Sequence, residues 1–357
     1  MPAYDHFPMR VWRTLSNQYW RQPTSDLLGY GTPHGYRPLR VAIAEHLNSV
    51  RGVNCEPDQV IIVSGSQQAL DLAFRVLLDP DDEVWIENPA YPGARSALVA
   101  AGARLVPVPV DSDGLDVSVG LRESPNARMA YVTPSHQYPL GATMSVARRM
   151  QLLRWADQRD AWIIEDDYDS EFRYSGRLLP TLQGLDTTGR TIYVGTFSKV
   201  MFPSLRLGYV VVPTELVDGF LAARAVTDRH PPTVEQAVLA EFISAGHFLR
   251  HVRRMRKLYA QRQVALLTAL DDTCGDLLTV GPDDAGMHLI GWLPEGVSDS
   301  LLAARSAERG VSTPPLSHYY NRGDAARAGV ILGYTGFDEA QLRSAARHFS
   351  EALRSCL

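Results

Sequence analysis

Short apolar runs alternate with helical stretches along the first two thirds of the chain. The run 60–63 (Val-Ile-Ile-Val) is followed by an apolar stretch with helical spacing at 69–78, and the same succession recurs up to residue 212. Strands that alternate with helices in this way predict a mostly parallel sheet covered by helices on both faces. We therefore expect an α/β fold. The expected strands are residues 60–63, 82–86, 104–110, 130–133, 162–167, 191–194 and 207–212.

The pattern changes around residues 229–233, where Arg-His-Pro-Pro-Thr precedes a long arginine-rich helical stretch. Beyond this point the expected strands are 287–292 and 329–334, and the expected helices are 234–270, 299–309 and 338–353. This mixture predicts a second, smaller α+β domain. We place the limits at 1–30 for an N-terminal arm, 31–225 for the large domain and 226–357 for the small domain.

Composition narrows the class of protein. The chain has 357 residues, of which 45% are hydrophobic and 21% charged, and its formal net charge is -5. These values are ordinary for a globular protein and give no basic field for nucleic acid. No apolar run approaches the roughly 18 residues of a membrane span, and the first residues lack a signal sequence. Cys55, Cys274 and Cys356 are too far apart to frame a metal or disulfide site, so we expect a cytoplasmic protein that binds no metal, membrane or nucleic acid.

The segment 195–208 (Gly-Thr-Phe-Ser-Lys-Val-Met-Phe-Pro-Ser-Leu-Arg-Leu-Gly) carries the clearest chemistry. Lys199 follows two hydroxyl residues, Thr196 and Ser198, and precedes Arg206. A lysine held between core strands is partly desolvated, which favours its neutral, nucleophilic form. Hydroxyls and an arginine suit a phosphate, so the segment indicates pyridoxal phosphate bound to the lysine as a Schiff base. The alternative is an ordinary surface lysine in a loop.

Four further residues follow or close expected strands. Ser66, Tyr91, Tyr138 and Asp166 all stand at the carboxyl end of a strand. Ligands bind beyond the carboxyl ends of strands in sheets of this kind, so we expect these side chains to meet Lys199 there. A pyridoxal phosphate site needs a carboxylate for the pyridine nitrogen, an aromatic ring to stack and a helix start for the phosphate. The chain supplies a candidate for each of these needs.

Several motifs resemble those of one family. Residues 64–72 (Ser-Gly-Ser-Gln-Gln-Ala-Leu-Asp-Leu), 88–93 (Asn-Pro-Ala-Tyr-Pro-Gly) and 165–172 (Glu-Asp-Asp-Tyr-Asp-Ser-Glu-Phe) resemble the class I and II aminotransferases of fold type I. Residues 134–141 (Pro-Ser-His-Gln-Tyr-Pro-Leu-Gly), with 195–199, narrow the resemblance to the aminotransferase-like domain of MocR-type regulators, which join it to a winged helix of the GntR family. The resemblance covers nearly the whole chain. It implies a fold-type I pyridoxal phosphate-dependent transferase, with a seven-stranded type of sheet and a smaller C-terminal domain.

The resemblance also assigns roles to residues. It implies that Lys199 forms the Schiff base, that Asp166 pairs with the pyridine nitrogen and that Tyr168 donates to the phenolic oxygen. Tyr91 is then the stacking ring. Tyr30 reaches the phosphate of the neighbouring subunit, so that a homodimer shares its active sites. The residues implied to hold the phosphate within one chain are Ser66, Gln67, Thr196, Ser198 and Arg206.

Two positions depart from the family pattern. Tyr138 stands where the family usually has an asparagine, and we count it among the residues expected at the cofactor. Ile331 stands where many members carry the arginine that grips the substrate carboxylate. Arg322 and Arg327 are nearby candidates to replace that arginine. The departures leave the substrate and the type of reaction open.

Three functions are compatible with these motifs. The simplest is an aminotransferase, in which Lys199 also moves the α-proton of an amino acid or amine. The second is other pyridoxal phosphate chemistry, such as β- or γ-elimination or replacement, or C–C bond formation. The third is the effector-sensing domain of a transcription regulator; the chain starts almost at once with the aminotransferase-like part, which favours the first two. Candidates to face the substrate, each with a structural role as the simpler interpretation, are His136, His318, Tyr319 and Tyr320.

Overall fold

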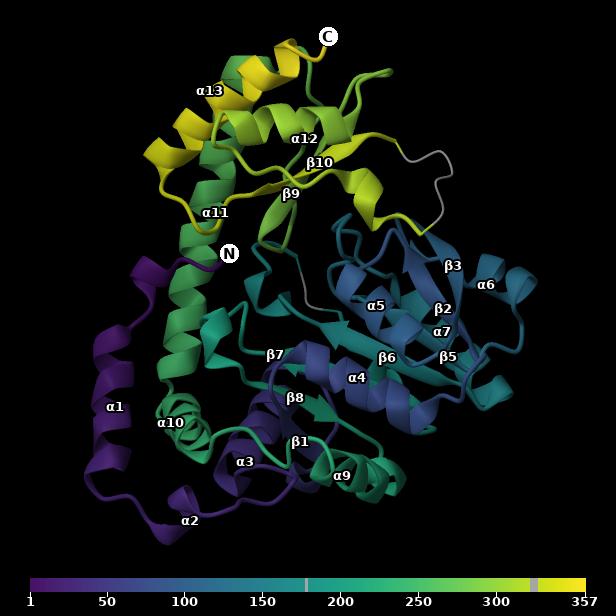
Figure 1. Ribbon diagram of the computed structural model, residues 1–357, viewed down its shortest axis with the longest axis vertical. Helices are drawn as coiled ribbons and strands as arrows, with labels where there is room; N and C mark the ends of the chain where they lie inside the picture. Colours follow the sequence, from purple (N-terminus) through teal and green to yellow (C-terminus); the bar gives the residue numbers. More distant parts are fainter. Residues whose placement is uncertain (177–178, 322–326) are drawn as a thin grey trace.

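An eight-stranded sheet forms the centre of the computed structural model, which describes residues 1–176, 179–321 and 327–357 (Figure 1). The strands are β1 (Val60–Val63), β2 (Glu83–Asn88), β3 (Arg104–Asp111), β4 (Gly114–Leu115), β5 (Met129–Val132), β6 (Trp162–Asp167), β7 (Thr191–Thr196) and β8 (Gly208–Val211). Their order is β1-β8-β7-β6-β5-β2-β3-β4. β3, β2, β5, β6 and β7 are parallel neighbours, whereas β8 pairs antiparallel with β7 and β1. The predicted mostly parallel α/β sheet is confirmed, and β4 adds a short antiparallel edge.

Helices cover both faces of this sheet. The first ten are α1 (Met9–Arg21), α2 (Ser25–Leu28), α3 (Arg37–His46), α4 (Ser66–Leu77), α5 (Pro92–Ala100), α6 (Val117–Glu123), α7 (Val146–Arg159), α8 (Leu182–Leu185), α9 (Val217–Ala225) and α10 (Thr233–Ser244). Ile61 and Val63 of β1 pack with α4, α5 and α9, whereas Ile62 packs with α3 and α10 on the opposite face. α6, α7 and α8 complete that opposite face beside β2, β5 and β6. Burial on both faces explains why the strands read as continuous apolar runs.

Short helical turns join several of these elements. They are η1 (Tyr4–His6), η2 (Leu47–Arg51), η3 (Pro57–Gln59), η4 (Ser170–Phe172), η5 (Pro203–Leu205), η6 (Thr214–Leu216) and η7 (Leu316–Tyr319). Among the helices of the described residues, none combines the length and the apolarity needed to cross a membrane.

The C-terminal part is built on a two-stranded antiparallel sheet. Its elements are α11 (His247–Cys274), β9 (His288–Trp292), α12 (Asp299–Glu308), β10 (Gly329–Gly333) and α13 (Glu339–Arg354). Figure 1 shows this part above the large sheet, with α11 running from one to the other. The prediction of one helix over 234–270 is wrong, because Gly246 adopts a left-handed φ of 71° that ends α10 and starts α11. The α+β character is confirmed, while the domain limits at 30 and 225 stay a prediction.

Helix α11 is 28 residues long and contacts both parts of the molecule. Near its start, His251 Nε2 donates to the carbonyl oxygen of Val200 over 2.9 Å, on the loop that carries Lys199. Farther along, the side-chain amide of Gln263 donates to the carbonyl of Asp283 over 3.1 Å and accepts from its amide over 3.3 Å. The same helix therefore touches the lysine loop and the C-terminal loop before β9.

The N-terminal segment packs along the outside of these helices, with α1 beside α10 in Figure 1. Phe7 lies against Phe202 and Phe242, with ring centroids 5.0 and 6.0 Å apart. The amide of Ala3 donates to Oη of Tyr259 on α11 over 3.0 Å. The N-terminal segment is thus helical over α1 and packs on its own chain.

Candidate active site

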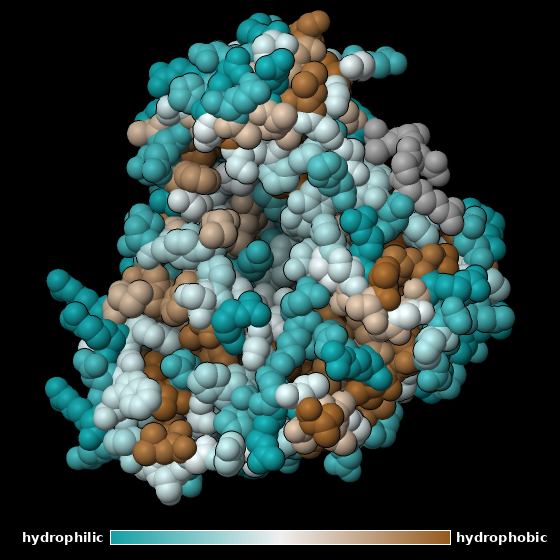
Figure 2. All heavy atoms as spheres, in the orientation of Figure 1, coloured by the Kyte–Doolittle hydropathy of each residue, from teal (hydrophilic) through white to brown (hydrophobic). Residues whose placement is uncertain are grey.

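The loops after β1, β2, β5, β6 and β7 meet at one edge of the large sheet and surround a cavity of about 260 Å³. β8 runs in the opposite direction, so Arg206 reaches the same edge from the start of β8. Figure 2 shows that this face of the molecule is hollowed near its centre, where the two parts meet. The residues that line the cavity are Ser66, Gln67, Tyr91, Tyr131, Thr133, Tyr138, Asp166, Tyr168, Thr196, Ser198, Lys199, Pro203 and Arg206. Of the eleven site residues named from the sequence, ten lie here and Tyr30 does not.

Asp166, the second-to-last residue of β6, is a buried acid of the cavity with one oxygen left unpaired by the described residues. Its side chain is buried, and Oδ2 accepts a hydrogen bond from Oη of Tyr131 over 2.8 Å. Oδ1 is also buried but has no hydrogen-bond partner among the described residues. Burial raises the pKa of Asp166 to about 7, against the opposing effects of the Tyr131 hydroxyl and of the charge on Lys199. The carboxylate can therefore accept one further donor from the cavity.

A second polar end of the cavity is the start of α4. Ser66 is the first helical residue, and Gly65 before it has a φ of 100° and no capping side chain. The guanidinium of Arg206 lies against Gly65 and donates to the carbonyl oxygen of Ser64 over 2.7 Å. The first amides of a helix have no acceptor within it, and they favour a bound anion. An arginine beside them adds a charged donor, so this end suits a phosphate.

Gln67 belongs to the same helix start, but its side chain is used elsewhere. Its Nε2 donates to the carbonyl oxygen of Gly93 over 2.9 Å, and Tyr91 Oη donates to its Oε1 over 3.5 Å. Only glycine fits at position 93, because a Cβ there would overlap the ring of Tyr91. Gln67 thus ties α4 to the turn that orients Tyr91, which leaves its backbone amide for an anion.

Lys199 stands on the loop after β7, where the amide of Ser198 donates to Oγ1 of Thr196 over 3.2 Å. Its side chain is exposed, so the expectation of a lysine partly desolvated between two strands is wrong. β7 ends at Thr196, and the lysine follows three residues later, at the open side of the cavity. The charge of Lys199 still acts on Asp166 across the cavity.

Tyrosines form the wall that faces the C-terminal part. The ring of Tyr138 meets those of Tyr91, Tyr168 and Tyr319 edge to face, at 6.0, 5.7 and 5.5 Å between centroids. Its hydroxyl donates to that of Tyr319 over 3.4 Å. Tyr319 belongs to η7 of the C-terminal part, so Tyr138 connects the cavity to that part. A tyrosine in place of the family's asparagine makes this wall aromatic.

The other candidates for a substrate contact do not line the cavity. His136 is buried at 1% exposure, with its Nδ1 2.9 Å from Oη of Tyr168. His318 is exposed on η7, and the carbonyl oxygen of Tyr320 accepts a hydrogen bond from Arg95 over 3.2 Å. His136, His318 and Tyr320 therefore fit a structural role better than a contact with the substrate.

Three further positions named from the sequence lie outside the cavity. Tyr30 is 90% exposed, with the guanidinium of Arg229 5.1 Å from its ring centroid. Ile331 is buried in β10 opposite Ile290. Arg327 lies 5.0 Å from the ring centroid of Trp292, and Arg322 falls outside the described residues.

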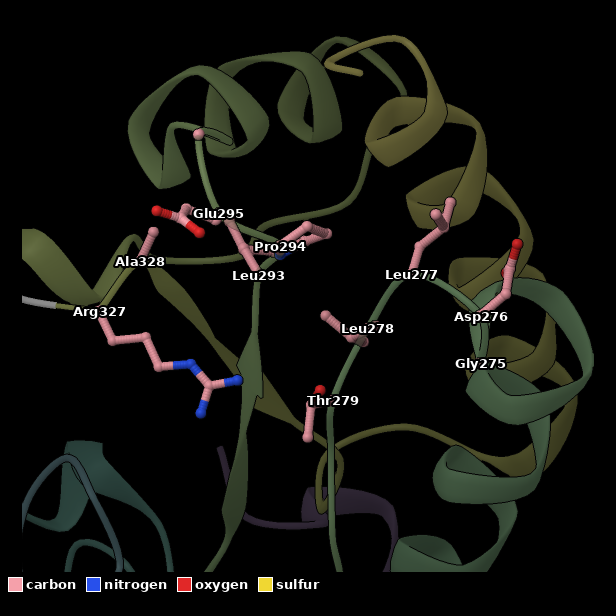
Figure 3. A pocket seen from close by; sticks show the side chains of 11 residues that line it. Gly275, Asp276, Leu277, Leu278, Thr279, Leu293, Pro294, Glu295, Arg327 and Ala328 are labelled. Atoms are coloured by element: carbon pink, nitrogen blue, oxygen red, sulfur yellow. The ribbon is translucent and has the colours of Figure 1, made fainter.

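Arg327 lines a different hollow, of about 610 Å³, which Figure 3 shows within the C-terminal part. Leucines and backbone form most of its wall, with the charged side chains of Asp276, Glu295 and Arg327 pointing apart at its edges. It therefore lacks the converging polar groups of the cavity around Asp166. Among residues 1–176, 179–321 and 327–357, no three histidine, cysteine or carboxylate side chains cluster as a metal site would require.

The cavity is also lined by Tyr131, Thr133 and Pro203, which were not among the residues expected from the sequence. Tyr131 and Thr133 alternate at the end of β5, next to β6, so both point to the face on which Asp166 lies. Thr133 Oγ1 accepts from the amide of Tyr138 over 3.0 Å and donates to the buried Glu87 over 2.7 Å. The strand's alternation was the available signal, but a buried tyrosine in a strand is indistinguishable from a core residue in sequence.

Comparison with known proteins gives one family. The model of the family "Aminotransferase class I and II" matches residues 2–344. A relative among curated proteins is the probable rhizopine catabolism regulatory protein MocR of Rhizobium meliloti, with 44% identity over 96% of this chain and 69% of its own length.

Solved structures give the same result. The kynurenine aminotransferase of Pyrococcus horikoshii, in a complex with PMP, is 30% identical, with a TM-score of 0.91 over 99% of this chain and 89% of its own. The α-aminoadipate aminotransferase LysN of Thermus thermophilus, complexed with N-(5'-phosphopyridoxyl)-L-leucine, is 29% identical, with a TM-score of 0.91 over 100% of this chain and 91% of its own.

Proposed function

Because this chain belongs to the family of class I and II aminotransferases, we propose that it is an enzyme that transfers the amino group of an amino acid or amine with the aid of pyridoxal phosphate. The solved structures that it resembles are named as aminotransferases, and one of them holds a phosphopyridoxyl derivative of leucine. Both facts support the cofactor and the type of reaction.

The single observation that carries the proposal is the buried, unpartnered Oδ1 of Asp166 in a cavity that also contains Lys199. A buried carboxylate oxygen without a donor is costly, and a protonated pyridine nitrogen satisfies it. At the other end, the start of α4 and Arg206 suit the phosphate. When bound, pyridoxal phosphate supplies an electron sink that stabilises negative charge on the carbon beside the amino group.

Several residues of the cavity then have a task. Asp166 would hold a proton at the pyridine nitrogen, and Tyr131 fixes the carboxylate of Asp166 by donating to its other oxygen. Tyr168 would donate to the phenolic oxygen of the cofactor, and Tyr91, which precedes α5, would stack on its ring. Ser66, Ser198 and Arg206 would bind the phosphate, through a helix amide, a hydroxyl and a guanidinium.

Lys199 acts as the base of the reaction. It stands on the loop at the open side of the cavity, where its Nζ can accept the proton of the substrate's α-carbon and return it to an adjacent atom. The hydrogen bond from His251 to Val200 holds the loop next to this lysine. The tyrosines of the wall exclude water from the side that faces the C-terminal part.

We also infer that the enzyme works as a cytoplasmic homodimer. Tyr30 is 90% exposed, and Leu28 and Val226, close in sequence to Tyr30 and Arg229, are 63% and 85% exposed. Large exposed apolar side chains of this kind support a protein interface. In the dimer, Tyr30 reaches the phosphate site of the neighbouring chain.

A second candidate function is supported by the 44% identity to a regulatory protein over 96% of this chain. In that case the cavity binds an amino compound through the cofactor with little turnover, and the adduct changes the conformation. A third candidate, elimination, replacement or C–C bond formation, is supported by Ile331, which supplies no charge for a substrate carboxylate.

The test is the absorbance spectrum of purified protein with added pyridoxal phosphate. The wild type is expected to show a visible band that the Lys199→Ala variant lacks. A panel of amino donors then separates the candidates. Formation of pyridoxamine phosphate with a keto or aldehyde product supports transfer, release of ammonia supports elimination, and a stable complex without product supports sensing. Absence of the band in the wild type would overturn the proposal.

A further inference from the structure

His136 lies behind the wall of the cavity and has a charged partner at each ring nitrogen. Its Nδ1 is 2.9 Å from Oη of Tyr168 and 3.0 Å from Oδ2 of Asp169. Its Nε2 is 3.3 Å from Oδ2 of Asp283. The side chains of His136 and Asp169 are both 1% exposed, so their contact is shielded from water, whereas the side chain of Asp283 is 25% exposed.

The two carboxylates keep His136 charged. Burial by itself lowers the pKa of His136, but Asp169 and Asp283 outweigh this effect and raise the pKa to about 10. The remaining titratable neighbours are Tyr168 and His288; burial lowers the pKa of His288 to about 4, so it stays neutral. A charged imidazole donates from both nitrogens and accepts at neither.

This charge decides the direction of the Tyr168 hydroxyl. Because Nδ1 of His136 carries one hydrogen, which Oη of Tyr168 and Oδ2 of Asp169 share as acceptors, the Tyr168 hydroxyl can accept from the imidazole but cannot donate to it. Burial raises the pKa of Tyr168 well above its usual range, so the hydroxyl keeps its own hydrogen. That hydrogen is available to an acceptor in the cavity that Tyr168 lines.

The ring of His136 has no space in which to turn. Gly286 and Gly141, with φ values of 89° and 83°, stand against it. A Cβ at Gly286 would overlap the imidazole, and one at Gly141 would overlap the carboxylate of Asp283 and stand 3.3 Å from Nε2. Close backbone approach on two sides fixes the orientation that both hydrogen bonds require.

We propose that His136 is a positioning residue, which holds the Tyr168 hydroxyl as a donor to the phenolic oxygen of bound pyridoxal phosphate and couples it to the C-terminal part through Asp283. The inference rests on the proposed function. Asp283 lies between α11 and β9, and Gln263 of α11 binds its backbone on both sides. A displacement of the C-terminal part therefore acts on Tyr168 through His136.

The experiment is a pH titration of the visible absorbance of the protein saturated with pyridoxal phosphate. The negatively charged phenolic oxygen attracts the proton on Lys199 Nζ. A hydrogen bond donated to that oxygen reduces its negative charge and therefore reduces this attraction. Loss of the bond therefore raises the pH midpoint of the absorbance change. His136→Phe and His136→Gln are expected to raise it by about one pH unit, the size of one hydrogen bond to a charged group.

A double-mutant cycle separates positioning from a general structural effect. In the Tyr168→Phe background, which has no hydroxyl to orient, His136→Phe should leave the midpoint unchanged. Asp283→Asn should give a smaller upward shift, and it keeps the test informative where His136 variants fail to fold. Its matched control is Asp284→Asn, which removes an exposed carboxylate of the same loop and should give no shift.

Two results overturn the inference: unchanged midpoints in the folded His136 and Asp283 variants, or an equal shift of His136→Phe with and without the Tyr168 hydroxyl. A wild type without a visible band overturns the proposed function instead. The two failures are therefore distinguishable. Thermal unfolding of each variant checks that it is folded.

Discussion

Tyr131 donates a hydrogen bond to Oδ2 of Asp166 over 2.8 Å, and within the described residues this leaves Oδ1 of the same buried carboxylate without a partner. Tyr131 has the sequence pattern of a core residue, whereas Asp166 was expected at the cofactor from its motif. Tyr131 fixes the carboxylate so that its second oxygen is presented to the cavity. The arrangement is complete only when a donor is bound there.

Removal of the buried charge should stabilise the cofactor-free protein at neutral pH. Burial raises the pKa of Asp166 to about 7, so this group contributes stability below its unfolded value near 3.8 and loses it as the pH rises towards 7. Asp166→Asn should therefore match the wild type near pH 4 and exceed it above pH 7, by up to about 4 kcal/mol. Urea unfolding across this pH range measures the difference. A difference that is constant with pH would contradict the assignment.

The same substitution should have the opposite effect on the enzyme with its cofactor. Asp166→Asn removes the carboxylate that pairs with the pyridine nitrogen, so we expect kcat/KM to fall by about 10²-fold or more. Single-turnover absorbance with a reactive amino donor measures the loss. Asp167→Asn is not a suitable control, because Asp167 binds Arg51 in the core over 2.6 Å.

Arg206 should contribute affinity for the phosphate only. Arg206→Ala is expected to raise the Kd of pyridoxal phosphate by about 10- to 100-fold, the range of one or two charge-assisted hydrogen bonds. The Kd of pyridoxal, which has no phosphate, should stay within about twofold, since the guanidinium then has no anion to bind. Fluorescence titration with both compounds tests the prediction. An equal loss for both would assign Arg206 to the structure of the loop.

Tyr91 should act through its ring rather than its hydroxyl. Tyr91→Phe loses the 3.5 Å hydrogen bond to Gln67 but keeps the stacking face, so the Kd of pyridoxal phosphate should change by less than about threefold. Tyr91→Ala removes the ring and should raise that Kd about tenfold. An equal loss in Tyr91→Phe and Tyr91→Ala would place the function in the hydroxyl, which both variants lack.

Tyr30 should act in the neighbouring chain. A hybrid of one Lys199→Ala subunit and one Tyr30→Ala subunit then has one site with both defects and one intact site. It should keep about half of the wild-type activity. If Tyr30 served its own chain, each site would carry one defect and the hybrid would be inactive. Co-expression with two affinity tags isolates the hybrid for this measurement.

Much of this architecture was predictable from the sequence because the signals are local. Buried strands such as β1 and β7 read as apolar runs. Lys199 and Tyr91 follow strands, and Asp166 lies near the end of one, and the carboxyl ends of these strands share one edge. The break between α10 and α11 was missed because Gly246 lies within an otherwise uninterrupted helical pattern. A glycine in the left-handed conformation does not change the spacing of the apolar residues, so the pattern gives no sign of the break.

The rest depends on contacts between residues far apart in the chain. His136 was noted as one of several candidates, but its partner Asp283 lies 147 positions away, and neither has a local signature. Tyr131 has the burial pattern of a core residue, and its bond to Asp166 depends on the pairing of β5 with β6. The exposure of Lys199 followed from the place where β7 ends, which apolar patterning predicts poorly.

Helix α11 sets a limit on insertions in this fold. His251, near its start, contacts Val200, and Gln263, twelve residues later, contacts the backbone of Asp283. The helix fixes the direction in which each of these two side chains points. A residue inserted between His251 and Gln263 would turn everything beyond it by about 100° and move it by about 1.5 Å. Length variation among related chains should therefore be rare in this stretch of α11 and confined to surface loops, where the register of a helix is not at stake.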